Sequence, residues 1–200
     1  MFGIVRAMKP LHPAATTALV VAAVAASVVP ACAAPAKTRT VTLQISGGHA
    51  TAPVDRGRPV VLIAAGLGVP TEVFRQAFSG VHPAGPERGP TDAEAQANKA
   101  ALMSVLAPHG VTSERLDEVS DHYRYMGSGG ELWRHRDARA TAVVRNGTVV
   151  SVRLVDGGAG YSSTPTVTVP GVPGASVTVT VSYGTDLSTN GAIGALQLTR

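Results

Sequence analysis

The spacing of apolar residues divides the chain into two parts near residue 137. Between residues 55 and 137, apolar side chains recur every three or four positions, a spacing that predicts amphipathic helices. From residue 138 to residue 200, Val alternates with Thr and other polar residues, which predicts strands with one buried face. The pattern therefore predicts an α+β protein, with a helical domain over 55–137 and an antiparallel β module over 138–200.

Four short helices are expected in the helical domain, arranged as two hairpins. Pro59 and Gly68 bracket the first helix. The run Thr91-Asp92-Ala93-Glu94 has the form of a capping box and begins the third helix, and Thr112 or Ser113 caps the fourth. The apolar pattern of the first two helices recurs in the last two, which predicts a duplicated helical hairpin. Because helices of this length are unstable alone, the two hairpins are expected to bury their apolar faces together.

The β module is expected to be a meander of short strands with sandwich-like packing. Asn146-Gly147 separates two alternating stretches and is a strong hairpin signal, because both residues tolerate positive φ. A second pair, Asn190-Gly191, precedes the last stretch, which repeats the apolar pattern of the stretch after Gly147. The repeat stops there, so the last strand is expected to leave an open edge that can pair with another chain.

Two motifs in the β module occur together in a known repeat. They are N-G-x-V at 146–149 and G-x-G-Y-x-x-x-P at 158–165. The stretch resembles a β-repeat of bacterial secreted proteins and phage tail-associated proteins, where it forms short structural or attachment units. In the helical domain, Gly57–Ala64 and Arg115–Ser120 resemble uncharacterised exported bacterial proteins, from which no activity carries over. The resemblance implies a β architecture and names no ligand.

The first 33 residues have the features of a secretory signal peptide. Arg6 and Lys9 precede an apolar run over 14–29, and Ala31-Cys32-Ala33 places small residues at the two positions that signal peptidase reads. The run is shorter than the ~20 apolar residues that a membrane-spanning helix needs, so cleavage is favoured over an uncleaved anchor. The chain is therefore expected to be exported to an extracellular, periplasmic or envelope-attached location, with no transmembrane span after cleavage.

Two further features surround the expected cleavage site. Val29-Pro30-Ala31-Cys32 resembles a bacterial lipobox, in which Cys32 is lipidated, although Pro30 departs from that pattern. Residues 34–54 are expected to form a flexible lead-in, in which the alternation around Leu43 permits one short strand.

Composition narrows the possible function classes. The chain has 17 Lys and Arg against 13 Asp and Glu. Arg6 and Lys9 leave with the signal peptide, which halves the net positive charge of +4. The remaining basic residues form no stripe, so no nucleic-acid partner is expected. A single cysteine excludes a disulfide scaffold.

One helix face carries the densest group of candidate metal ligands. Glu118, Asp121 and His122 lie within about one helical turn, where carboxylate and imidazole groups could bind a transition metal. The alternative is a solvated face on which Arg115 pairs with Glu118 and Asp121 pairs with Arg124. No H-E-x-x-H motif completes a metal site, and neither catalytic residues nor a cofactor are expected.

Four aromatic residues lie near the boundary between the two parts. Tyr123, Tyr125, Trp133 and Tyr161 either form a binding surface there or pack the helices onto the strands. The leading interpretation is a secreted or envelope-attached, non-enzymatic binding or structural protein whose partner is a protein or an envelope polymer. The alternative is an extracytoplasmic metal-dependent or hydrolytic enzyme that uses the helix face with Glu118.

Overall fold

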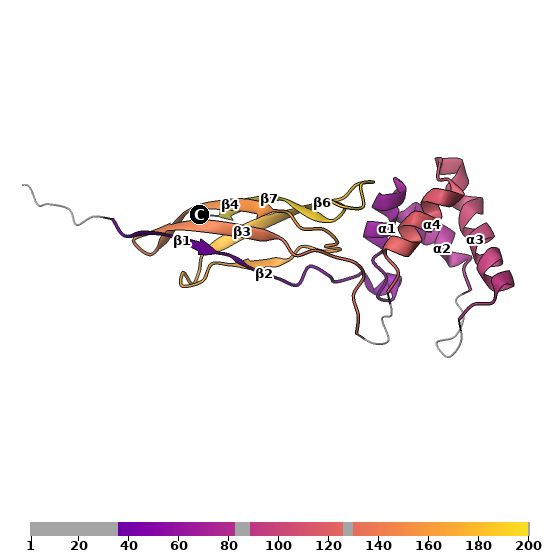
Figure 1. Ribbon diagram of the computed structural model, residues 1–200, viewed down its shortest axis with the longest axis horizontal. Coiled ribbons are helices and arrows are strands. Elements are labelled where there is room, and N and C mark those ends of the chain that lie inside the picture. The colour runs from indigo at the N-terminus through magenta and orange to yellow at the C-terminus, as the bar shows by residue number, and fades with distance from the viewer. Residues whose placement is uncertain (1–35, 83–88, 126–129, 200) are drawn as a thin grey trace, which may run out of the picture. The chain divides into compact units, whose positions relative to one another are not determined.

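The computed structural model describes residues 36–82, 89–125 and 130–199. Within them the protein is a mixed α+β structure with four α-helices and several antiparallel sheets (Figure 1). The chain from Ala36 onward forms one compact unit that includes both the helices and the strands. The expected signal peptide, with Cys32, lies outside the described residues.

The four expected helices are present and begin where local sequence signals place them. Thr91 and Glu94 form the predicted capping box, and the Thr112 side chain, not Ser113, caps the last helix by accepting a bond from Arg115 N. Helix α2 contacts α1 and α3, and α4 contacts α1. The helices are α1 (Val60–Leu67), α2 (Thr71–Ser79), α3 (Asp92–Leu106) and α4 (Ser113–His122), with single 3-10 turns η1 (Pro53–Asp55) and η2 (Ala107–His109).

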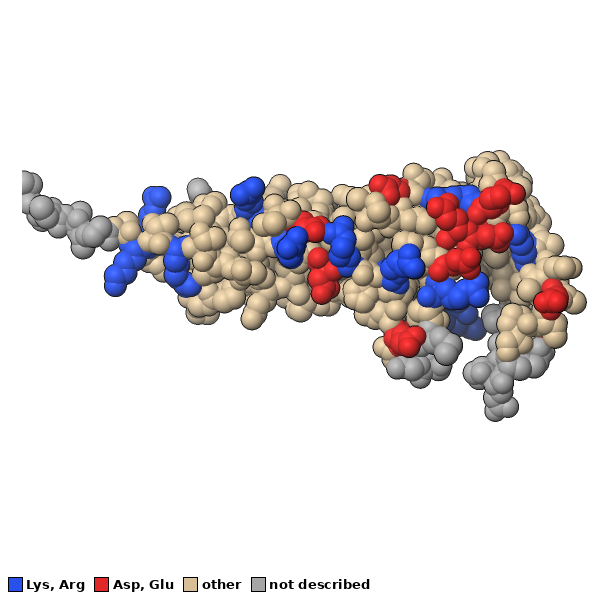
Figure 2. All heavy atoms as spheres, in the orientation of Figure 1, with Lys and Arg blue, Asp and Glu red and all other residues tan. Residues whose placement is uncertain are grey.

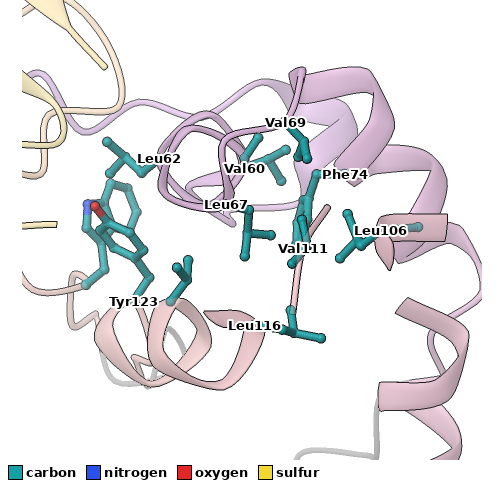
Figure 3. Close-up of a cluster of buried hydrophobic side chains, with 13 residues drawn as sticks. Val60, Leu62, Leu67, Val69, Phe74, Leu106, Val111, Leu116 and Tyr123 are labelled. Atoms are coloured by element: carbon teal, nitrogen blue, oxygen red, sulfur yellow. The ribbon is translucent and has the colours of Figure 1, made fainter. Parts of the chain in front are cut away.

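The helices enclose one apolar core (Figure 3). Leu62, Leu106 and Val119 are fully buried in it, and they come from three different helices. Figure 3 shows Leu62 and Tyr123 at one end of this core and Leu106 at the other. The helices are too short to be stable separately, so this shared core is what stabilises them.

No single helix among the described residues has the length and apolar character of a membrane span. Helices α1 and α2 meet those criteria only as a pair, and the pair is bent by 105° at the break between them.

The strands form three antiparallel sheets, with the orders β1-β3-β4, β2-β5 and β6-β7. The hairpin β3-β4 turns at Asn146-Gly147 as predicted, with φ of 50° and 81°. Alternate residues of the strands are buried, as in the pattern of β3, where Ala140, Ala142 and Val144 point inward. The strands are β1 (Thr38–Thr42), β2 (Gln44–Ser46), β3 (Arg139–Arg145), β4 (Thr148–Asp156), β5 (Thr166–Thr168), β6 (Ser176–Ser182) and β7 (Ala192–Thr199).

The lead-in expected over 34–54 is not a flexible tether where the structure describes it. Residues 38–46 form two strands instead of the single one permitted by the sequence, and these strands complete sheets with β3 and β5. The physical reason is that the alternation around Leu43, which is 5% exposed, buries one face of the segment. Its backbone meanwhile pairs with strand edges that would otherwise be open.

The second Asn-Gly pair plays a different role from the first. Gly191 has a positive φ of 70°, but β6 and β7 are joined by the longer loop 183–191 rather than by a two-residue turn. Strand β7 pairs antiparallel with β6, and β4 likewise pairs antiparallel with β3. Asn190 is 1% exposed and is turned into the protein.

Candidate functional site at the junction of helices and strands

Asn190 connects the β6–β7 loop to two helices. Its Nδ2 donates to the Leu62 carbonyl oxygen of α1 at 2.7 Å and to the Tyr123 hydroxyl after α4 at 2.8 Å. Its Oδ1 accepts a bond from Gly184 N at 3.2 Å. Burial raises the pKa of Tyr123 to about 12, so its hydroxyl stays neutral beside the amide. These bonds fix the loop of the β module to the end of the helical core.

Arg115 makes a second connection at the same junction. Its guanidinium donates through Nη2 to the Gly66 carbonyl oxygen at 2.6 Å and also to that of Thr185. Gly66 lies in the last turn of α1, whose carbonyl oxygens lack helical partners and attract a cation. The same guanidinium pairs with Glu118 at 2.6 Å. Arg115 therefore acts as a structural connector between α1, α4 and the β6–β7 loop.

The G-x-G-Y motif builds the strand side of the junction. Trp133 Nε1 donates to the Gly160 carbonyl oxygen at 2.8 Å, and Gly160 N donates to the Asn190 carbonyl oxygen at 2.8 Å. The Tyr161 hydroxyl accepts a bond from Ala138 N at 2.9 Å. At Gly160 φ is +84°, and a side chain there would meet the backbone of residues 134–135. At Gly158 φ is +67°, and a side chain there would meet the Arg136 carbonyl oxygen. Both glycines of the motif are therefore required by close packing as well as by positive φ.

The four aromatic residues singled out in the sequence differ in how they meet solvent. Tyr123, Trp133 and Tyr161 are 3%, 2% and 3% exposed, so they offer little surface to a partner. Tyr123 and Trp133 belong to the helical core, whereas Tyr161 packs with Ala138 among the strands. Tyr125 is half-buried: its ring lies edge-on to Trp133, with ring centroids 5.7 Å apart, and its hydroxyl donates to the Gly57 carbonyl oxygen at 2.6 Å.

Two histidines that are far apart in the sequence come together beside this cluster. The ring centroids of His49 and His135 are 4.8 Å apart, and the His49 ring stacks on Tyr161 at 5.2 Å. The His49 Nε2 atom is buried and has no hydrogen-bond partner in the structure. Burial lowers the pKa of His49, His135 lowers it further, and Asp137 acts in the opposite direction. Sequence reasoning missed this pair because His49 falls in the lead-in that was expected to be flexible.

Lowering the pH from 7 to 5 is expected to reduce the free energy of unfolding through His49. Its pKa is lower in the folded than in the unfolded protein, so below the unfolded value the unfolded state binds more protons. His122, whose pKa burial also lowers, contributes in the same direction. Urea unfolding at each pH measures the effect, and His49→Phe, which keeps a ring on Tyr161, should flatten the profile. The exposed His109→Gln is the control, and an equal flattening by His109→Gln would contradict the assignment.

The helix face proposed as a metal site is occupied by ion pairs. Arg115 pairs with Glu118 at 2.6 Å and Arg124 with Asp121 at 2.7 Å, which confirms the predicted salt bridges. The His122 ring lies edge-on to Tyr123, with centroids 4.7 Å apart. In the part of the chain that the structure describes, no three His, Cys, Asp or Glu side chains come close enough to hold a metal ion.

Charged residues are unevenly distributed over the protein surface. Figure 2 shows acidic and basic side chains close together over the helices, with fewer charges along the strands. Two ion pairs of the helical part join Lys99 to Asp117 at 2.6 Å and Arg75 to the buried Asp55 at 2.8 Å.

No family model matches the sequence, and no curated protein or solved structure is detectably similar to it.

Proposed function

We propose that the protein is exported and acts outside the cytoplasm as a non-enzymatic binding or structural protein. The observation that carries this proposal is the use of polar side chains at the junction. Asn190, Arg115 and Trp133 each bond to backbone oxygens that connect helices with strands or loops. The Glu118 and Asp121 carboxylates are neutralised by arginines one turn away. The junction residues therefore hold a scaffold together, and the sequence features of residues 1–33 support its export.

The proposal includes a finer architecture for both parts. Helix α1 contacts α2, which supports the first helical hairpin, whereas α3 packs on α2 and is joined to α4 by the ion pair of Lys99 with Asp117. With the contact of α4 on α1, these contacts support one packed four-helix arrangement. Val144, Val167 and Leu196 come from the three different sheets and share one apolar cluster, which supports a sandwich-like β module. Such a module presents its outward-facing Thr and Ser side chains to a protein or an envelope polymer.

An open strand edge offers a further means of attachment. Strand β7 pairs with β6 and also contacts β4. Among the described residues its only other ladder-like bond runs from Ile193 N to the carbonyl oxygen of Gly157, the residue after β4, at 2.8 Å, so the rest of this edge lacks ladder bonds. An unpaired edge can accept a strand from another chain. Self-association through β7 is therefore part of the proposal.

Expression of the full chain with a C-terminal tag in a bacterium is expected to yield an exported protein without residues 1–33. The basic, apolar and small-residue segments direct cleavage after Ala33. Intact-mass spectrometry of the exported fraction tests this cleavage. The Cys32→Ser variant then distinguishes a free from a lipidated protein. If Cys32 is lipidated, the wild-type protein is found in the membrane fraction and the variant is not; if it is not lipidated, the two proteins fractionate alike. A cytoplasmic product that retains residues 1–33 would contradict export.

The non-enzymatic part of the proposal has its own test. A variant with Glu118→Ala, Asp121→Ala and His122→Ala removes every candidate ligand on the α4 face. Native mass spectrometry of the wild-type protein is expected to show no bound metal. A metal that the wild-type protein binds and the triple variant loses would favour the enzyme that uses this face.

A further inference from the structure

A groove beside η1 lies apart from the hydrogen bonds of the junction. Its volume is about 330 Å³, which is at the small end of the range of ligand pockets. A volume of this size holds roughly ten non-hydrogen atoms, at about 30 Å³ for each. The lining includes three arginines, Arg56, Arg58 and Arg75, the acid Asp55, and apolar side chains among which are Val54 and Phe78.

The charges of the groove do not cancel. Asp55 is 6% exposed, and Arg75 contacts both of its carboxylate oxygens, through Nε at 2.8 Å and Nη2 at 2.9 Å. Arg75 also pairs with Glu72. Neither Arg56 nor Arg58 pairs with a carboxylate of any described residue. The groove therefore holds two guanidinium groups that have no carboxylate partner among the described residues, and with Glu72 included its net charge is positive.

The Arg58 guanidinium and the Arg56 backbone are held in place before any ligand arrives. The Arg58 guanidinium carbon lies 4.4 Å from the centroid of the Phe78 ring, and Nη1 donates to the Asp55 carbonyl oxygen at 3.3 Å. Arg56 has a left-handed backbone, with φ of 51°, and its N–H donates to the Pro53 carbonyl oxygen at 3.2 Å. A guanidinium that is already fixed loses less conformational entropy when it forms a bidentate hydrogen-bonded pair with an oxyanion.

The wall of the groove is apolar next to these cations. Val54 is 69% exposed, the largest exposed fraction among the large apolar side chains described. Phe78 lies under Arg58, and its ring and the Val54 side chain line the same groove as the two cations. A ligand that neutralises the arginines would also gain by covering this apolar surface.

We propose that the groove binds a small amphipathic anion, with its oxyanion on Arg56 and Arg58 and its apolar body against Val54 and Phe78. The inference deepens the proposed binding function and rests on it. It is tested on the purified protein, so a failure to bind would leave export and the scaffold role standing. Carboxylate and phosphate heads both match the guanidinium fork, and the choice of probes distinguishes them.

The test is a titration of the ¹⁵N-labelled protein with sodium octanoate, octyl phosphate, n-octanol and inorganic phosphate at constant ionic strength. Octanoate or octyl phosphate is expected to shift the amide signals of residues 54–58, with a Kd on the order of 1 mM or below. Whichever of these two ligands has the lower Kd shows whether the groove prefers a carboxylate or a phosphate head group. Equal or tighter binding of n-octanol or inorganic phosphate would overturn the proposal, because it requires both the charge and the apolar body.

Variants locate the site. In Arg56→Asn the new residue can adopt the left-handed backbone conformation. Arg58→Lys keeps the positive charge but removes the two parallel N–H donors of the guanidinium. Each substitution is expected to weaken binding of the amphipathic anion about tenfold. Val54→Ser, at an exposed position, should weaken binding of the amphipathic anion but not of inorganic phosphate. Arg145→Gln, at an exposed arginine at the end of β3, is the control and should bind as the wild type does. Unchanged affinity in the Arg56→Asn and Arg58→Lys double variant would overturn the assignment.

Discussion

Replacing Asn190 with alanine is expected to lower the free energy of unfolding by about 3 kcal/mol. The substitution leaves the buried Tyr123 hydroxyl without its described partner, and it removes one bond each from the Leu62 carbonyl oxygen and the part-buried Gly184 N–H. A buried polar group without a partner lowers the free energy of unfolding by more than the net contribution of its hydrogen bond, because burial has also removed the water molecules that would otherwise bind it. Urea unfolding followed by circular dichroism measures the change.

Asn98→Ala is the matched control for this prediction. Asn98 also makes two side-chain bonds, from Nδ2 to the His82 carbonyl oxygen at 3.0 Å and from His82 N to Oδ1 at 2.9 Å, but both are exposed to solvent. Water can replace these bonds, so the loss is expected to be about 1 kcal/mol or less. Equal losses in the two variants would contradict a special role for the Asn190 bonds.

Gly160→Ala, in the G-x-G-Y motif, is expected to lower the free energy of unfolding by about 3–5 kcal/mol. A Cβ at this position would lie 2.8 Å from both the Arg134 carbonyl oxygen and the His135 Cβ. These neighbours belong to backbone or lie directly on it, so they cannot turn away. Relief of the clash requires movement of the chain, which disturbs the bond from Trp133 to Gly160.

Gly174→Ala separates backbone strain from crowding. Gly174 has φ of +86°, close to the +84° of Gly160, but a Cβ added at Gly174 would meet no described atom within 4 Å. Left-handed strain alone costs about 1–2 kcal/mol. Thermal unfolding of both variants measures the difference, and equal losses would mean that the tight packing around Gly160 contributes nothing.

Local sequence signals were sufficient to predict most of the secondary structure. The capping box at Thr91 and the hairpin at Asn146-Gly147 depend on residues that are neighbours in the chain, and both are present. The pairs of Arg115 with Glu118 and Arg124 with Asp121 were likewise predictable, because residues three apart on a helix share a face.

The junction could not be predicted, because its contacts join residues that are distant in the sequence. Asn190 stands before a glycine, which typically indicates a turn, and nothing local indicates that its amide bonds to Leu62. His49 meets His135 only because β1 and β2 draw the lead-in into the sheets. The exposure of Val54 beside the two arginines of the groove is likewise a property of the folded chain.

The helices and the strands form a single scaffold that is joined through Asn190 and Arg115. Differential scanning calorimetry of the purified protein tests it most directly. We predict one transition whose calorimetric and van't Hoff enthalpies agree, shifted as a whole to lower temperature by Asn190→Ala. Two separate transitions, one of them unmoved by Asn190→Ala, would contradict the account.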